Sequence, residues 1–192
     1  MKYLIILLSA GLLTLFPHRP VSICNKPLIG PADTDTLVIG DIDNDKIIDT
    51  AFITGPKWLN DEDGWGDPVI TPYEIDITFS CSLPAIHHGN AVMGYIEDIG
   101  DIDGDGVSEV IVVPIWFIGC WGNMEFYTLK DGQWHNFGSA GCHICTDEIY
   151  LGRITKLSRN KIKVMEDAWD EDVADRIRKP KVLRLDSWKK AK

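Results

Sequence analysis

Two aspartate-rich segments that lie 60 residues apart constrain the fold of this chain more than any other feature. Residues 39–49 align without a gap with residues 99–109, and both segments begin with Ile-Gly-Asp-Ile-Asp. An apolar run that is typical of a β-strand follows each segment directly. Similarity at a fixed spacing indicates a duplicated supersecondary unit. We therefore expect two repeat units, near residues 36–56 and 96–116.

Most of the remaining chain has the pattern of strands joined by tight turns. Residues 73–79 alternate apolar and polar side chains with the period of a half-buried strand. Further strands are expected in two hairpins, 125–129 with 133–137 and 154–157 with 161–164, and in a closing strand at 181–185. Only residues 170–178 show helical spacing, because Val173 and Ile177 lie four residues apart. The sequence therefore predicts an all-β domain with one short helix.

Carboxylates occupy positions 1, 3, 5 and 9 of both aspartate-rich loops. They are Asp41, Asp43, Asp45 and Asp49 in the first loop, and Asp101, Asp103, Asp105 and Glu109 in the second. Carboxylates so close together repel one another unless a cation neutralises them. Ligation by oxygen alone suits Ca²⁺, which accepts about six to eight oxygens in a flexible geometry, better than Mg²⁺. The sequence predicts two calcium sites, with the carbonyl groups of Ile47 and Val107 as further ligands.

The residues that follow the loops distinguish between kinds of calcium loop. An EF-hand needs glutamate at position 12 and flanking helices, but Phe52 and Val112 stand there, within strand-like runs. Dockerin-type repeats also continue into a helix. The loops instead resemble the FG-GAP repeat of integrin α-chains and of many exported bacterial proteins, whose Gly-Asp-x-Asp-Gly-Asp-Gly-x-x-Asp core precedes a hydrophobic strand. Residues 100–109 match that core nearly throughout, and residues 40–49 match it less fully.

This resemblance implies a β-propeller-like architecture. The chain is too short for a closed propeller of seven blades. We expect a truncated β-propeller-like assembly of two or three antiparallel sheets, built on two FG-GAP-like units. Lys46 stands where the family usually has glycine, and left-handed backbone is strained for lysine. Glu109 replaces aspartate and reaches further. We therefore expect the second loop to be the better-formed site.

The first 22 residues have the pattern of an export signal. Lys2 precedes an apolar stretch that ends before Pro17 and is shorter than the roughly 20 residues of a transmembrane helix. Residues 1–22 are interpreted as a signal peptide or an N-terminal anchor, and residues 23–192 as a single all-β domain. Cys24 raises the alternative of lipidation. The predicted location is periplasmic or extracellular, with any membrane contact made through the N-terminus.

Charge and cysteine content restrict the partners and the chemistry. The net charge of −10 argues against nucleic acid and against anionic lipid as partners. Export permits disulfides. Four cysteines within the domain allow three pairings, and the sequence leaves the connectivity open: Cys81, Cys120, Cys142 and Cys145. For the Cys-His-Ile-Cys segment at 142–145, a structural disulfide is favoured over zinc or redox chemistry.

Motifs for catalysis are missing from the sequence, among them Gly-x-Ser-x-Gly, His-Glu-x-x-His and a phosphate loop. His87 and His88 are interpreted as part of an exposed turn. Residues 116–121, which hold two tryptophans, are interpreted as a core strand that leads to a disulfide-pinned loop, with sugar or partner binding as the alternative. The main hypothesis is a non-catalytic, calcium-binding module or scaffold for a protein or glycan. The alternative is a polysaccharide hydrolase that uses a carboxylate pair.

Overall fold

The computed structural model describes residues 28–29, 34–56, 59–60, 73–116, 119–145 and 150–187. The segment interpreted as a signal peptide or anchor, residues 1–22, lies outside this part of the chain, as does Cys24. The described residues form an all-β structure of antiparallel sheets with one short 3-10 helix, which confirms the all-β part of the predicted fold. A two-residue pairing of β1 (Leu28–Ile29) with β4 (Leu59–Asn60) stands apart from the three larger sheets.

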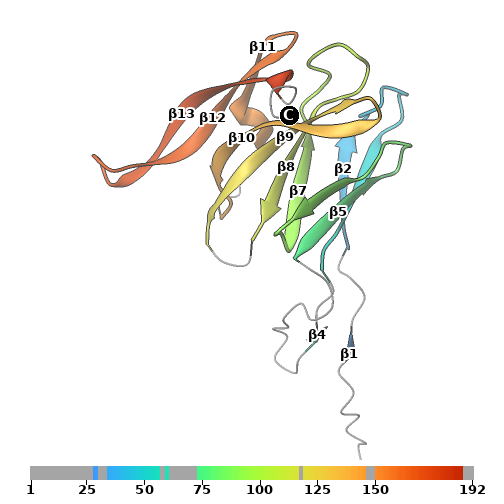
Figure 1. Cartoon of the computed structure of the whole chain (residues 1–192), viewed down its shortest axis with the longest axis horizontal. Coiled ribbons are helices and arrows are strands. Elements are labelled where there is room, and N and C mark those ends of the chain that lie inside the picture. The colour runs from blue at the N-terminus through green and yellow to red at the C-terminus, as the bar shows by residue number, and fades with distance from the viewer. Residues whose placement is uncertain are drawn as a thin grey trace, which may run out of the picture.

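Two four-stranded sheets and one three-stranded sheet make up the body (Figure 1). The first sheet has the strand order β2 (Thr34–Gly40), β3 (Asp49–Thr54), β5 (Glu74–Phe79), β6 (Ile86–Gly89). The second has the order β10 (Gln133–His143), β9 (Trp121–Lys130), β8 (Val110–Ile115), β7 (Met93–Asp98). The third follows the 3-10 helix η1 (Tyr150–Arg153) and contains β11 (Ile154–Ser158), β12 (Lys161–Asp170) and β13 (Asp175–Arg184).

The second sheet lies between the other two and packs against both (Figure 1). Strand β8 shows why its sequence is continuously apolar. Val110 and Val112 belong to the core shared with the first sheet, whereas Ile111 and Val113 belong to the core shared with the third. All four are fully or almost fully buried. A strand covered on both faces loses the alternation of a half-buried strand, because each face needs apolar side chains.

Two glycines allow close approach between the sheets. A Cβ atom at Gly94 in β7 would lie 2.7 Å from Cδ1 of Ile75 in the first sheet. A Cβ atom at Gly141 in β10 would lie 2.6 Å from the carbonyl oxygen of Asp167 in the third sheet. Both separations are shorter than a carbon atom tolerates. A side chain at Gly94 would displace the end of Ile75, whereas Gly141 faces backbone and therefore requires the absence of a side chain.

The expected helix at residues 170–178 is wrong. Strand β12 continues to Asp170, a turn follows, and β13 begins at Asp175. The Asp170 carboxylate accepts hydrogen bonds from the N–H groups of Asp172 at 2.9 Å and of Val173 at 3.3 Å, which favours a turn over a helix. Val173 is exposed, so its spacing from Ile177 does not reflect a buried helical face. The other hairpins and the closing strand are confirmed.

A disulfide joins Cys120 to Cys145, which settles the pairing that the sequence left open. Cys81 and Cys142 are free thiols, the second of them buried. The bond closes a loop of 25 residues that links the start of β9 to the segment after β10. We expect reduction to lower the free energy of unfolding by about 2–4 kcal/mol, because the unfolded chain regains the entropy that the cross-link removes. Urea unfolding with and without a reductant measures this difference, and Cys120→Ala should reproduce it without reductant.

Candidate metal centre

The two acidic loops occupy the same place in their sheets. The first loop, residues 41–49, leads from β2 into β3, and the second loop, residues 101–109, leads from the end of β7 to β8. In each sheet these are the first two strands in chain order. The strand after the loop pairs on its other side with the third strand of the sheet, β5 or β9. Strand pairing therefore fixes both ends of each loop.

Left-handed backbone at positions 4 and 6 gives both loops the same path. The φ angles are +60° at Asn44 and +74° at Lys46, against +77° at Gly104 and +95° at Gly106. Asparagine and glycine adopt this conformation readily, whereas lysine does so at a cost. The left-handed backbone that the sequence suggested for Lys46 is confirmed. Lysine in place of glycine at position 6 therefore leaves the two loops with the same left-handed backbone at this position.

The carboxylate at position 1 organises each loop from within. Asp41 accepts hydrogen bonds from the backbone N–H groups at positions 5 and 6, at 3.0 and 2.9 Å. Asp101 accepts from the same two positions, at 3.2 and 3.0 Å, and also from the N–H of Gly104. Aspartate at this position therefore stabilises the tight turn as well as contributing negative charge.

The carboxylates at positions 5 and 9 also accept equivalent hydrogen bonds in the two loops. Asp45 and Asp105 each accept a hydrogen bond from the N–H at position 7, at 2.7 and 3.0 Å. Asp49 and Glu109 each accept one from the N–H at position 2, at 3.1 and 2.7 Å. The two loops thus share hydrogen bonds as well as residue types. Ligation by the carbonyl groups of the position 7 residues, Ile47 and Val107, stays a prediction.

In each sheet, a hydroxyl group in or directly after the third strand donates a hydrogen bond to the carboxylate at position 9. Ser80, directly after β5, donates to Oδ1 of Asp49 at 3.0 Å, and Thr128, in β9, donates to Oε1 of Glu109 at 2.9 Å. Both carboxylates are buried, at 3 % and 1 % exposure. Burial raises the pKa of Glu109 to about 7, against the opposing effect of its hydrogen bonds. The sequence did not predict these hydroxyls, because they lie far along the chain from the loops.

The isoleucine at position 2 anchors each loop in a core. Ile42 is fully buried between the first and second sheets, and Ile102 is 4 % exposed between the second and third. The carbonyl oxygen of Ile42 also accepts a hydrogen bond from the N–H of Ser108 at 2.9 Å, which joins the two loops directly. The sequence signal for this anchor is the isoleucine that recurs at position 2 of both copies.

Carboxylates of each loop converge on a small volume. Ligand oxygens lie within 4.8 Å of one another in Asp41, Asp43 and Asp45 of the first loop, and in Asp101, Asp103 and Glu109 of the second. Asp103 is only 9 % exposed, and its Oδ1 is buried without a hydrogen-bond partner among the described residues. A buried oxygen of this kind needs a partner. An all-oxygen donor set with one unpartnered carboxylate oxygen fits a hard divalent cation.

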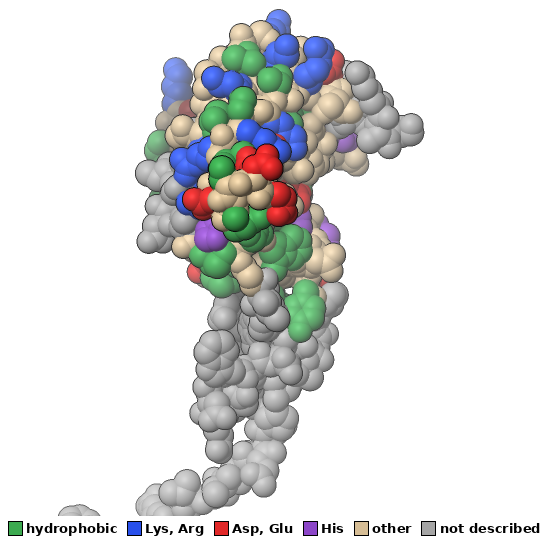
Figure 2. Space-filling view, turned by 90° about the vertical axis from the view of Figure 1, so that its left-hand side faces the viewer, with side chains coloured by type: hydrophobic (Ala, Val, Ile, Leu, Met, Phe, Trp, Pro, Cys, Tyr) green, Lys and Arg blue, Asp and Glu red, His purple; other side chains and the backbone are tan. Residues whose placement is uncertain are grey.

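The second loop also contacts three basic side chains. Lys130, at the end of β9, lies 2.5 Å from Oδ2 of Asp103 and donates to Oδ2 of Asp105. Burial acts to lower the pKa of Lys130, but the two carboxylates outweigh it and raise the pKa. Lys156 and Arg159, from the β11–β12 hairpin, donate to the carbonyl oxygens of loop positions 1 and 3. Figure 2 shows basic side chains gathered beside acidic ones on the side where the β12–β13 hairpin projects.

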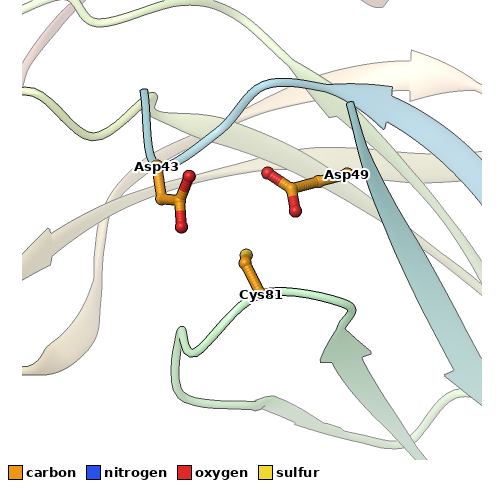
Figure 3. A group of neighbouring side chains, drawn as sticks. All are labelled: Asp43, Asp49 and Cys81. Atoms are coloured by element: carbon orange, nitrogen blue, oxygen red, sulfur yellow. The ribbon is translucent and has the colours of Figure 1, made fainter. Parts of the chain in front are cut away.

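A free thiol lies beside the first loop. Cys81 brings its Sγ within 4.8 Å of carboxylate oxygens of Asp43 and Asp49, and Figure 3 shows these two carboxylates turned toward each other near the cysteine. Burial first, and the neighbouring Asp49 as well, raise the pKa of Cys81 to about 11. A hard divalent cation prefers the carboxylate oxygens of this group to the sulfur atom.

The structure places some of the histidines and tryptophans differently from the sequence-based predictions. The predicted exposed turn at His87 and His88 is wrong, because both residues lie in β6. His88 is largely buried and pairs with Glu125 at 3.1 Å. Trp116 lies edge-on to the His88 ring, and Trp121 is 44 % exposed at the start of β9, next to the disulfide.

Comparison with protein-family models, with curated proteins and with solved structures gives no match. Within the described residues, no helix has the length and apolar character needed to span a membrane.

Proposed function

We propose that this protein is a non-catalytic, exported, calcium-binding module with FG-GAP-like units, and that it binds or supports a protein or glycan partner. The observation that carries the proposal is the convergence of three carboxylates of the second loop around the buried, unpartnered Oδ1 of Asp103. The matching hydrogen bonds of the first loop support it. Converging carboxylates repel one another, and in the second loop Lys130 offsets only part of this repulsion, so a bound cation would stabilise the fold.

Calcium would be held by the converging carboxylates, which are Asp41, Asp43 and Asp45 in the first loop and Asp101, Asp103 and Glu109 in the second. When bound, the ion supplies positive charge that offsets the mutual repulsion of these groups and braces the loop. The chain's own part is to hold the carboxylates in place with backbone N–H groups and with the hydroxyls of Ser80 and Thr128. Such an ion stabilises a binding surface and needs no role in chemistry.

A propeller-like arrangement of the sheets is part of the proposal. Two facts support it: the first and second sheets each carry an acidic loop between their first two strands, and successive sheets pack face to face. The third sheet has three strands and would represent a shortened unit without an acidic loop. Repeated sheets that stack in this way bury a core at each junction and leave the loops along one edge.

Export is supported by the disulfide between Cys120 and Cys145, because such bonds persist in oxidising compartments. The partner is proposed to be a protein or a glycan, since the net charge of −10 disfavours polyanions. Binding to a glycan array, assayed beside a panel of polysaccharide hydrolysis reactions, separates a binding module from the hydrolase alternative. Turnover of any polysaccharide would contradict the non-catalytic part of the proposal.

Calcium is expected to stabilise the folded protein. At a free calcium concentration 100 times the dissociation constant, one site adds about 2.7 kcal/mol to the free energy of unfolding. For a domain of this size, that corresponds to a rise in Tm of roughly 5–10 °C relative to EDTA. Thermal melts in calcium and in EDTA measure the shift, and isothermal titration calorimetry counts the sites.

Matched variants connect that shift to the loops. Asp43→Asn and Asp103→Asn keep the size of the side chain and should each remove one binding event and reduce the calcium-dependent rise in Tm. Asp131→Asn is the control, because Asp131 is exposed in the β9–β10 turn with left-handed backbone that asparagine accepts. Equal melting curves in calcium and in EDTA, without binding heat, would rule out the proposed calcium sites.

A further inference from the structure

The second loop carries a counter-charge that belongs to the chain itself. The ammonium group of Lys130 contacts one oxygen of Asp103 and one of Asp105, and its side chain is only 26 % exposed. It reaches the loop from the end of β9, the strand that also supplies the Thr128 hydroxyl. An ion pair between a half-buried ammonium and two carboxylates removes part of their mutual repulsion. The loop therefore has a cation available without any metal.

Lys130 satisfies only part of the acidic group. It contacts Oδ2 of Asp103, whereas Oδ1 of the same carboxylate is buried without a partner. Asp103 also belongs to the converging group with Asp101 and Glu109. A divalent cation that binds this group would lie beside the ammonium, and like charges at such separations repel strongly in a half-buried site. The ammonium and the metal therefore compete for Asp103.

Among the described residues, the first loop shows the same arrangement with no lysine ion-paired to its carboxylates, although Lys46 belongs to the loop itself. Ser80 and Thr128 play equivalent roles. The register pairs Ala51 with Phe79 and Ile111 with Phe126, so the position four residues further on is Leu83 in the first sheet and Lys130 in the second. Within the described part of the chain, no Lys or Arg forms an ion pair with the four carboxylates of the first loop. The pairing with Lys130 is thus an added feature of the second loop and not a property of the repeat.

We propose that Lys130 is a tethered cation that competes with a divalent ion for the second loop. This inference rests on the proposed calcium-binding function. At low calcium, Lys130 neutralises Asp103 and Asp105 and keeps the loop folded. At high calcium, the metal displaces the ammonium into solvent, which its flexible four-carbon chain permits. Lys130 thereby sets the calcium concentration at which the second loop is filled.

Replacement of Lys130 tests this competition. In an Asp43→Asn background, which silences the first loop, Lys130→Met should tighten calcium binding about tenfold, equivalent to about 1.4 kcal/mol. The same variant should melt at a lower temperature in EDTA, because the carboxylates then lack a counter-charge. Calorimetric titration with calcium chloride and thermal melts in EDTA measure the two effects. Opposite signs in the two assays are the signature of a competitor.

Lys156→Met is the matched control. Lys156 belongs to the same loop environment, but its ammonium donates to the backbone carbonyl of Asp101 at 3.0 Å and contacts no carboxylate there. Its loss removes the same charge with a much smaller expected change in calcium affinity. Lys130→Gln, which keeps a polar side chain, provides a second variant if the methionine variant fails to fold, as judged by circular dichroism.

The outcomes separate this inference from the function on which it rests. If folded Lys130→Met or Lys130→Gln binds calcium no more tightly than Lys156→Met does, Lys130 is not a competitor, although the loops still bind calcium. If neither the wild type nor the Lys130 variants give binding heat with calcium, the proposed function itself is wrong, and the inference falls with it.

Discussion

Asp167→Asn is expected to lower the free energy of unfolding by about 3–5 kcal/mol, because it breaks the buried ion pair with Arg153. The Asp167 side chain is fully buried and lies 2.8 Å from Nη1 of Arg153, which is itself 4 % exposed. Its carboxylate also accepts a hydrogen bond from the N–H of His143 at 2.9 Å and contacts Arg178. Equilibrium unfolding in urea measures the loss. The effect is large because asparagine keeps the shape of the side chain but removes the negative charge.

The same cluster predicts how stability depends on pH. Burial acts to raise the pKa of Asp167, but the hydrogen bonds from Arg153 and from the His143 N–H outweigh it and hold the pKa below its usual value. A depressed pKa in the folded state means that the unfolded state binds the proton more tightly. The stabilisation is therefore complete above the pKa of an unfolded aspartate and is lost as the pH falls through the lower folded-state pKa. Asp167→Asn should remove this acid-sensitive part of the stability.

Asp186→Asn serves as the comparison for this experiment. Asp186 pairs with Arg184 at 3.1 Å, but both side chains are about half exposed, at 43 % and 56 %. Exposed ion pairs contribute about 0–1 kcal/mol. A loss at Asp167 as small as that at Asp186 would mean that the Arg153 charge is solvated after all, and would contradict the account of this cluster as the link between η1, β10 and β12.

The predictable parts of the fold are those that local sequence determines. The acidic loops appear as a repeat because their turn needs aspartate and left-handed residues at fixed positions, and the hairpin at Asp131-Gly132 follows from the same local preference. The hairpin between β12 and β13 was mistaken for a helix because Val173 and Ile177 happen to be four residues apart. Long-range pairing with β12 decides that segment, since strand partners lie far apart in sequence.

The candidate site is predictable only in its carboxylates. Ser80 directly follows β5, and Thr128 and Lys130 lie in β9; nothing in the sequence around the loops points to these residues. Of these three residues, Lys130 most alters the expectation that the second loop is the better-formed metal site. The sequence favours the second loop by its closer match to the FG-GAP pattern, yet that loop is the one in which a lysine pairs with the acids. Chain topology, which brings β9 to the second loop, produces this difference.

Ile42→Ala is expected to lower the free energy of unfolding by about 2–5 kcal/mol and to weaken calcium binding at the first loop. Ile42 is fully buried, so its truncation leaves a cavity between the first and second sheets. Its N–H donates to Asp49, and its carbonyl accepts from Ser108. A shift of this residue therefore moves a carboxylate of the first loop and the backbone of the second together. Urea unfolding and calcium titration of the same preparation measure both effects.

Ile47→Ala separates the contribution of the core from that of the loop. Ile47 lies in the same loop, but its side chain is 65 % exposed, so truncation removes little packing. We expect a stability change within about 0.5 kcal/mol and unchanged calcium affinity, because the carbonyl group proposed as a ligand is retained. If Ile42→Ala destabilised the protein but left calcium binding intact, the loop would keep its shape independently of the core. If Ile42→Ala lowers both the stability and the calcium affinity, and Ile47→Ala lowers neither, then the isoleucine at position 2 couples the acidic loop to the packing of the sheets.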